Sequence, residues 1–344
     1  MIDFLIIGQG LAGTTLAHVL RERKQSFHIA DRTDHNSSTK VAAGLINPIT
    51  GRRYVKSWMV DTFIPYAASF YKSLEEEHHT SFYHEMDIHK ILANDEIVQI
   101  FNEKMEQEEM KGWKSISSFK KPETVKYTAK NIGSIIGARL DTITYLSKSL
   151  NLFLKENCFI EKVITNKAIE IRNNEIHFNG NTYKNLVFCE GYQLKDNEFF
   201  NYLPLNLCKG EVLTISGAHQ LNGCYQKNNF IMPINDNDIK LGSNYEWKQL
   251  DDQPTEAIKE TLLEKMDSIL DFDYKVKNHQ AGIRPTVKDR RPLMGNHPEH
   301  SNLFVFNGLG TKGVSLAPFM ANHLADHIID QKPLMEEVDI KRFN

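Results

Sequence analysis

The sequence has no apolar run close to the roughly 20 residues that a membrane-spanning helix needs. It also has little net charge: 41 basic residues are balanced by 44 acidic ones, so no global positive field favours nucleic acid. Residues 1–3, Met-Ile-Asp, carry no basic segment of the kind that opens a signal peptide. We therefore expect a cytoplasmic protein with no membrane partner.

Cysteine is scarce and irregularly spaced. The four cysteines, Cys158, Cys189, Cys208 and Cys224, form no CxxC pair and no metal-ligand spacing. The 14 histidines are scattered without a matching pattern of carboxylates. We expect free thiols in a reducing compartment and no metal site.

Glycine is concentrated near the start of the chain. Directly after the apolar run 4–7 stand Gly8, Gly10 and Gly13, followed by a segment, 14–22, with helical spacing. The first glycine allows a tight turn, the second lets main chain approach a pyrophosphate, and the third lets helix pack on strand. The helix would direct its first N–H groups and its positive dipole end at the phosphates. This pattern predicts a βαβ unit that binds an adenine dinucleotide.

An acid closes the second apolar run of this unit. Asp31 follows residues 27–30 and can accept hydrogen bonds from a ribose diol. Because NAD and FAD use the same glycines and the same acid, the fingerprint leaves the cofactor open. A glycine turn without any ligand is the remaining alternative.

The rest of the chain alternates between helical and strand patterns. At 344 residues it is long enough for two closely joined domains. Segments 210–215, 229–234 and 238–243 predict successive antiparallel strands, and a final helix is expected over 316–329. We expect these strands to be inserted into the nucleotide-binding fold, which holds both chain ends.

Two late segments carry further chemistry. In segment 281–295, Arg284 stands between Gly282 and Pro285, and its planar fork suits a carboxylate. A structural ion pair with an acid such as Asp289 is the alternative role for this arginine. Segment 307–318 is a glycine-rich loop that leads into the final helix, so its amides can stabilise negative charge at a helix N-terminus.

Together with the N-terminal fingerprint, these segments resemble the FAD-dependent D-amino-acid oxidase superfamily, which includes glycine and sarcosine oxidases. The resemblance extends to residues 38–45, Val163 and 189–191. It implies an α/β fold in which a Rossmann-like FAD-binding domain (1–75, 140–205 and 280–344) carries an inserted antiparallel-sheet substrate domain (76–139 and 206–279).

The resemblance also implies site residues. Expected FAD contacts are Gly8, Gly10, Leu11, Ala12, Gly13, Asp31, Arg32, Ser38, Thr39, Ala43, Gly44, Leu45, Val163, Glu190, Gly191, Gly282, Gly308, Gly310, Thr311, Lys312, Gly313 and Val314. Arg284 and Lys312 are expected to bind a substrate carboxylate. The implied reaction is oxidation of a C–N bond in an amino acid or secondary amine, by hydride transfer to flavin.

The sequence departs from glycine oxidases at two positions. Thr311 stands where they carry a second arginine, and Phe230 stands where they carry a tyrosine. Loop 308–313 is instead similar to that of the C-terminal FAD domain of the bifunctional tRNA wobble-uridine modification protein. Two alternatives therefore remain: a stand-alone tRNA-modifying oxidase that removes a carboxymethyl group, and a non-catalytic dinucleotide-binding protein.

Overall fold

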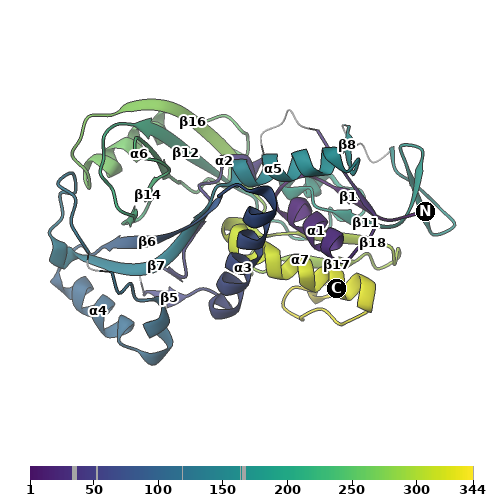
Figure 1. Ribbon diagram of the computed structural model, residues 1–344, viewed down its shortest axis with the longest axis horizontal. Coiled ribbons are helices and arrows are strands. Elements are labelled where there is room, and N and C mark those ends of the chain that lie inside the picture. The colour runs from purple at the N-terminus through teal and green to yellow at the C-terminus, as the bar shows by residue number, and fades with distance from the viewer. Residues whose placement is uncertain (33–36, 52, 118, 163, 165–167, 344) are drawn as a thin grey trace.

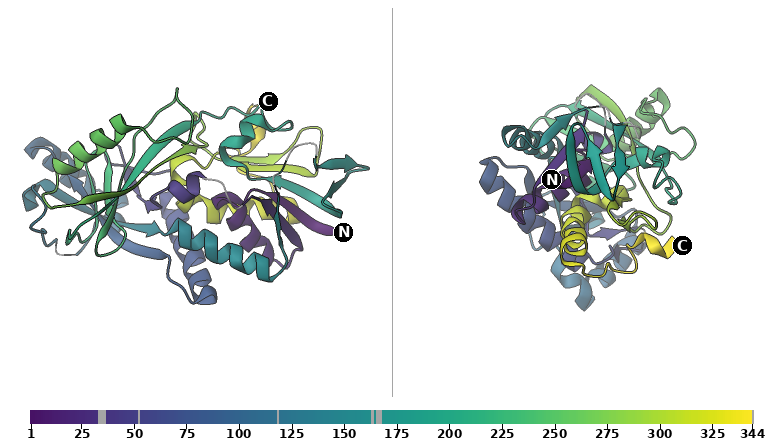
Figure 2. Two further views of the ribbon diagram at one scale, coloured as in Figure 1. Left: turned by 90° about the horizontal axis from the view of Figure 1, so that it is seen from above. Right: turned by 90° about the vertical axis from the view of Figure 1, so that its right-hand side faces the viewer.

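The computed structural model describes residues 1–32, 37–51, 53–117, 119–162, 164 and 168–343. Among these residues, two eight-stranded sheets lie beside each other along the long axis (Figure 1), and a two-stranded ribbon joins β4 (Ile49–Thr50) to β5 (Val55–Lys56). Figure 2 shows from two further directions that both chain ends lie in the half built on the first sheet. None of the described helices is long and apolar enough to cross a membrane. A cytoplasmic location stays a prediction.

The first sheet contains the predicted βαβ unit. Its strands follow the order β17-β18-β11-β1-β2-β8, with β10 paired to β11 and β9 paired to β10. Their bounds are β1 Ile2–Ile7, β2 Phe27–Asp31, β8 Phe159–Glu161, β9 Glu170–Arg172, β10 Glu175–Phe178, β11 Asn181–Phe188, β17 Leu293–Asn296 and β18 Leu303–Asn307. β1 pairs in parallel with β2 and β11, and α1 (Leu11–Glu22) connects β1 to β2. The predicted α/β fold is confirmed.

The apolar run of β1 is continuous because both faces of this sheet are covered. Phe4 and Ile6 pack into one core with α1 and α7 (Gly313–Asp330), whereas Leu5 and Ile7 pack into another core on the opposite face. All four side chains are buried. Two more helices, α3 (Val60–His78) and α5 (Thr142–Lys155), pack into the first of these cores.

The second sheet is largely antiparallel and follows the order β16-β12-β15-β14-β13-β6-β7-β3. Its strands are β3 Leu45–Ile46, β6 Tyr83–Ile91, β7 Ile132–Leu140, β12 Cys208–Ser216, β13 Cys224–Gln226, β14 Phe230–Pro233, β15 Asp238–Gly242 and β16 Lys275–Arg284. The antiparallel pairing expected for 210–215, 229–234 and 238–243 is found between β12, β15 and β14. α4 (Asp95–Met105) and α6 (Glu256–Asp267) cover this sheet through buried side chains such as Phe101 and Leu262.

Short elements complete the description. They are α2 Ser38–Val41 and the 3-10 turns η1 Glu108–Trp113, η2 Ala129–Asn131, η4 Gly191–Asp196, η5 Gly310–Lys312 and η6 Ile340–Phe343. The second sheet takes β3 and the end of β16 from segments that the sequence assigned to the FAD-binding domain. The proposed domain division therefore stays a prediction.

Candidate active site

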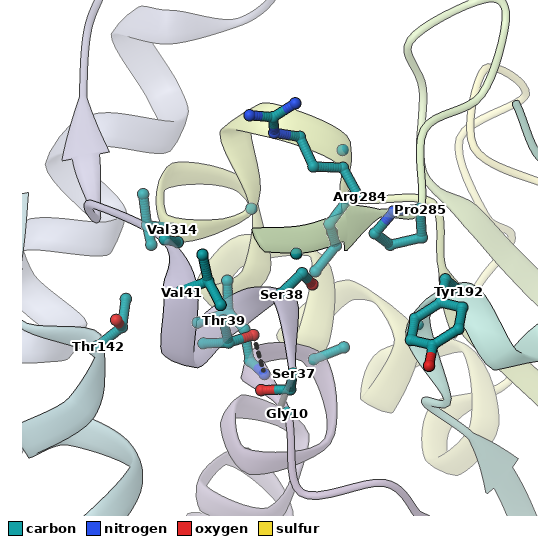
Figure 3. A pocket seen from close by; sticks show the side chains of 18 of the residues that line it. Gly10, Ser37, Ser38, Thr39, Val41, Thr142, Tyr192, Arg284, Pro285 and Val314 are labelled. Carbon is teal, nitrogen blue, oxygen red and sulfur yellow. Dashed lines mark hydrogen bonds between the residues drawn. The ribbon is translucent and has the colours of Figure 1, made fainter. Parts of the chain in front are cut away.

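A cavity of about 410 Å3 is lined by loops of the first sheet and strands of the second. Every predicted site residue lines it apart from Gly13 and Gly308, which are buried outside its wall, and Val163, which lies outside the described residues. Figure 3 shows part of this wall, with Gly10 and Thr39 at one side and Arg284 extending away from them. The structure thus brings the N-terminal glycines, the late glycine loop and Arg284 to one place.

The three N-terminal glycines differ in their surroundings in the way that the fingerprint predicts. Gly8 has φ +105°, and a Cβ there would lie 2.5 Å from the carbonyl oxygen of Cys189. A Cβ on Gly13 would lie 1.9 Å from the carbonyl oxygen of Gly8, so this glycine lets α1 pack on β1. At Gly10, which lines the cavity, the nearest atom to a Cβ is Thr39 Oγ1 at 3.7 Å. Main chain is therefore open to a ligand at Gly10, where α1 begins.

Two carboxylates lie farther along the same wall. Asp31 accepts hydrogen bonds from the main-chain N–H groups of Gln9 (2.6 Å) and Arg32 (2.7 Å). Glu190 accepts one from the Asn197 side chain at 2.7 Å. Burial raises the pKa of Glu190 to about 7, and the nearby Asp31 adds to the rise. Both acids can accept from hydroxyl groups of a bound dinucleotide, as expected for Asp31.

The late glycine loop leads into α7 next to the start of α1, since a Cβ on Gly313 would lie 2.8 Å from the Leu11 side chain. Gly310, Thr311, Lys312, Gly313 and Val314 line the cavity where this helix begins. Lys312 Nζ donates a hydrogen bond to Ser57 Oγ at 2.8 Å. Burial, with Arg290 and Arg291 nearby, lowers the pKa of the Lys312 ammonium. This end of the cavity therefore combines a cation with the positive end of a helix dipole.

Arg284 presents a charge without a carboxylate partner among the described residues. Its guanidinium donates to Ser243 Oγ (2.6 Å) and to the carbonyls of Asn244 (3.3 Å) and Lys209 (3.4 Å). It also lies 5.1 Å from the ring centre of Tyr245. All these groups are neutral, so the positive charge is available to an anion in the cavity.

The alternative role for Arg284 is wrong. Asp289 pairs with Arg342, whose Nε lies 2.9 Å from its carboxylate, rather than with Arg284. Space for the guanidinium is kept by a glycine, because a Cβ on Gly210 would lie 1.7 Å from an Arg284 nitrogen. Neutral acceptors therefore hold Arg284 at the cavity wall, and the absence of a side chain at Gly210 on β12 leaves room for its guanidinium.

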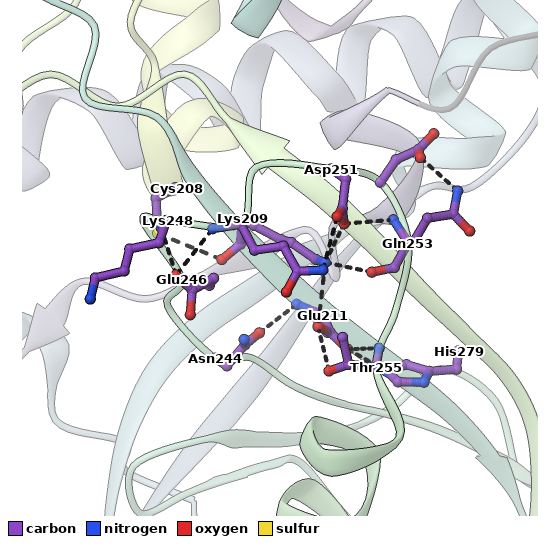
Figure 4. Close-up of polar contacts among 12 residues, drawn as sticks. Cys208, Lys209, Glu211, Asn244, Glu246, Lys248, Asp251, Gln253, Thr255 and His279 are labelled. Carbon is purple, nitrogen blue, oxygen red and sulfur yellow. Dashed lines mark hydrogen bonds and ion pairs between the residues drawn. The ribbon is translucent and has the colours of Figure 1, made fainter.

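A buried polar network supports this wall from behind (Figure 4). Lys209 is 1% exposed, and its Nζ lies 2.5 Å from Asp251 and 3.8 Å from Glu211. Glu211, also 1% exposed, lies 2.9 Å from His279 and accepts from Thr255. Its own main-chain N–H donates to Asn244 Oδ1 at 2.7 Å. The network thus fixes the segment that carries Ser243, Asn244 and Tyr245.

Several wall residues were not predicted from the sequence. Asn47, Gln226 and Ser243 line the cavity, yet each stands outside any motif. Phe230, noted only as a departure, lines it as well. Among the described residues, no group of three histidine, cysteine or acidic side chains is arranged to hold a metal ion.

Comparison with known proteins places the chain. The family model described as "FAD dependent oxidoreductase" (DAO) matches residues 3–327. The chain belongs to this family. The expected FAD-dependent enzyme is thereby confirmed, and the nicotinamide and non-catalytic alternatives are set aside.

Individual relatives are distant. Glycine oxidase of Bacillus subtilis strain 168 is 23% identical over 371 residues, which cover 96% of this chain and 94% of that protein. The tRNA 5-methylaminomethyl-2-thiouridine biosynthesis bifunctional protein MnmC of Vibrio vulnificus is 24% identical over 206 residues, 48% of this chain and 30% of that protein. The structure of iminodiacetate oxidase from Chelativorans sp. BNC1 shares the fold, with a TM-score of 0.81, 16% identity and 98% coverage of both chains.

The cavity wall fits FAD. Open main chain at Gly10, at the start of α1, suits the pyrophosphate, and the Asp31 carboxylate suits a ribose diol. The start of α7 can face the pyrimidine end of the flavin, where negative charge develops on reduction. These contacts remain predictions for the individual residues.

Proposed function

We propose that this protein oxidises the C–N bond of a small amine or amino acid that carries a carboxylate. The observation that supports this proposal is Arg284, a guanidinium at the cavity wall whose described partners are all neutral. Its planar fork can bind a carboxylate with two parallel hydrogen bonds. FAD, when bound, supplies a two-electron acceptor for the electrons of the broken C–H bond.

The protein's own contribution is mainly positioning and electrostatics. Arg284 would fix the carboxylate, which limits how the adjacent carbon can lie in the cavity. Lys312 and the first turn of α7 would stabilise negative charge where that helix begins. Hydride transfer from the adjacent carbon needs the lone pair of the amine nitrogen, so the substrate amine would react in its neutral form. The imine product is then hydrolysed by water.

The sheets support a proposed division of labour between domains. Main chain from the first sheet would hold FAD, and side chains from the second would hold the substrate. The boundaries that we propose are those expected from the sequence, with FAD bound by 1–75, 140–205 and 280–344.

An anaerobic absorbance experiment tests the proposed reaction. The protein, loaded with FAD, is mixed with glycine, sarcosine, iminodiacetate, proline and several D-amino acids, and each is paired with the same amine lacking its carboxylate. We expect at least one carboxylated amine to bleach the flavin band, and its partner without the carboxylate to leave the band unchanged. Equal bleaching by both members of each pair would contradict the function of Arg284.

A second candidate function is oxidation of a carboxymethylated tRNA base. Tyr245 and Trp247 are stacked with ring centres 5.9 Å apart, and both remain exposed although Tyr245 lines the cavity. Exposed aromatic rings are the usual platform for an unstacked base. Salt-dependent binding of tRNA, lost in Trp247→Ala, would favour this candidate, whereas no tRNA binding at low salt would eliminate it.

A further inference from the structure

A buried lysine without a carboxylate partner lies behind the wall of the second sheet. Lys90, on β6, is 7% exposed, and its Nζ donates to Gln226 Oε1 (2.5 Å), the Ile49 carbonyl (3.0 Å) and Asn47 Oδ1 (3.4 Å). Among the described residues, no acid lies within ion-pair distance of it. Burial lowers its pKa to about 8, so it is mostly charged at neutral pH. Such a buried charge is costly, which suggests that it has a function.

The network around Lys90 fixes which way Asn47 points. The main-chain N–H of Ile49 donates to Asn47 Oδ1 at 3.2 Å, and Lys90 donates to the same oxygen. A main-chain N–H and an ammonium can only donate. The Asn47 oxygen must therefore face them, and its Nδ2 faces Gln226.

The same reasoning orients Gln226. Its Oε1 accepts from Lys90 Nζ at 2.5 Å and from Asn47 Nδ2 at 2.9 Å. Because both neighbours donate, the atom of Gln226 that faces them must be the acceptor Oε1. The hydrogen bonds therefore determine the orientation of the Gln226 amide. The Nε2 group has no acceptor among the described residues, and Gln226 lines the cavity. The wall thus offers a fixed N–H donor backed by a positive charge.

This donor lies away from Arg284 across the second sheet. Gln226 on β13 pairs with Phe230 on β14, which pairs with Gly242 at the end of β15. Ser243, the next residue, binds the Arg284 guanidinium. Two strand spacings, roughly 10 Å at the main chain, therefore separate Gln226 from the residue that holds Arg284. The two donors face different parts of one cavity.

We propose that the substrate amine carries a second oxygen acceptor, on the substituent opposite the carboxylate that Arg284 binds, and that Gln226 Nε2 donates to it. Lys90 is the positioning residue, since it holds the Gln226 oxygen and adds positive potential behind the amide. This substrate class is an amine with two oxygen-bearing arms, and a second carboxylate fits best. The inference rests on the proposed binding of a carboxylated amine.

The variant Gln226→Glu separates a binding function from a structural one. The new carboxylate can accept from Lys90 and Asn47 as the amide oxygen does, but it removes the free N–H donor. It also places a negative charge beside the second arm of the substrate. If Gln226 only satisfies Lys90 and lies away from the substrate, the variant will bind both probes as the wild type does.

The test measures binding of two probes by anaerobic calorimetry to FAD-loaded protein whose flavin has first been reduced with dithionite, so that neither probe can react. Sarcosine carries one carboxylate, and iminodiacetate adds a second on the opposite arm. We expect the wild type to bind iminodiacetate more tightly. In Gln226→Glu, the affinity for iminodiacetate should fall by about tenfold or more, as expected for a lost hydrogen bond to a charged group. The affinity for sarcosine should fall by less than about threefold.

Two further variants complete the test. Lys90→Met should lower the affinity for iminodiacetate more than the affinity for sarcosine. In the double variant with Gln226→Glu, the affinity for iminodiacetate should fall by less than the product of the two single fold-changes, because both residues act through one network. Gln107→Glu is the matched control: this exposed glutamine also accepts from a lysine, Lys104 at 2.7 Å, and its variant should change neither probe.

Other outcomes overturn the inference. The inference is contradicted if Gln226→Glu lowers the affinities for both probes equally or leaves the preference for iminodiacetate unchanged. It is also contradicted if the wild type binds iminodiacetate no more tightly than sarcosine. Failure of the proposed function gives a different result: no carboxylated amine would reduce the flavin, whatever the preference between the two probes.

Discussion

The two sides of the cavity are built by different means. On the first-sheet side, the wall is mostly main chain, and glycines such as Gly10 keep it open. On the second-sheet side, charged side chains such as Arg284 and Lys90 are held by neutral acceptors from segments that are distant in the sequence. Main-chain recognition depends on consecutive residues, whereas side-chain recognition depends on how strands pair. Changes on the first side should therefore affect FAD, and changes on the second should affect the substrate.

The largest expected effect is on the first side. Gly13→Ala places a Cβ 1.9 Å from the Gly8 carbonyl oxygen, so α1 must move away from β1. We expect loss of FAD binding and destabilisation of about 3 kcal/mol or more. Bound FAD in the purified protein and urea unfolding measure both effects. Gly112→Ala is the control, since no atom lies within 4 Å of its added Cβ. Normal FAD content in Gly13→Ala would contradict this account.

Arg284→Ala should separate the two sides. FAD content should match the wild type, because Arg284 contacts the second-sheet wall. Affinity for a carboxylated amine should fall by roughly 100-fold, the effect of a lost charged hydrogen-bonded contact of about 3 kcal/mol. Arg284→Lys keeps the positive charge but lacks the planar guanidinium, so its affinity for the carboxylated amine should lie between that of the wild type and that of Arg284→Ala. Loss of FAD in Arg284→Ala would instead indicate a structural arginine.

A buried histidine makes the first side sensitive to acid. His18 is 4% exposed, and burial lowers its pKa to about 3, while its Nε2 lies 2.7 Å from Ser149 Oγ. The folded protein therefore keeps it neutral, and the unfolded chain takes up the proton below its usual pKa of about 6.5. The free energy of unfolding should have its full value above about pH 6.5 and should decrease as the pH drops toward 3. At pH 5 the decrease should be about 2 kcal/mol.

Urea unfolding at pH 7.5 and pH 5 checks this dependence. His18→Gln cannot titrate, so it should lose less stability between the two values than the wild type loses. An equal loss in both proteins would assign the acid sensitivity to other groups.

The smallest effect is expected at the rim of the second side. Tyr245 and Trp247 are both more than half exposed, and Tyr245 alone lies beside the Arg284 guanidinium. Trp247→Ala should change the KM of a small carboxylated amine by less than about threefold, because exposed contacts contribute little. Tyr245→Ala should have the larger effect. The reverse order would favour a substrate that extends beyond the cavity, as a tRNA does.

The same difference explains what the sequence predicts. The glycine fingerprint, Asp31 and the βαβ unit were predicted because each lies in a short contiguous pattern. Arg284 was predicted from its place between Gly282 and Pro285, yet its partners Ser243 and Asn244 lie 41 and 40 residues away. Gln226 and Lys90 could not be found, since β13 and β6 become neighbours only when the sheet forms.

One helix shows the limit of periodicity alone. The spacing of apolar residues over 142–156 predicts a helix that Thr142 caps, but the side chain of Asp141 accepts from the Thr144 main-chain N–H at 3.1 Å. The same spacing predicts that Ile143 faces inward, but Ile143 is 53% exposed, while Tyr145 is fully buried. The inward face is set by contacts with α1 and α3, which a single helical pattern does not contain.

The most direct test of this account is a crystal structure of the protein with FAD and iminodiacetate, grown without oxygen. We predict the pyrophosphate against the main chain at Gly10, one carboxylate on the Arg284 guanidinium, and the other carboxylate accepting from Gln226 Nε2. FAD bound elsewhere, or both carboxylates away from Arg284, would contradict the division of the cavity into a main-chain side and a side-chain side.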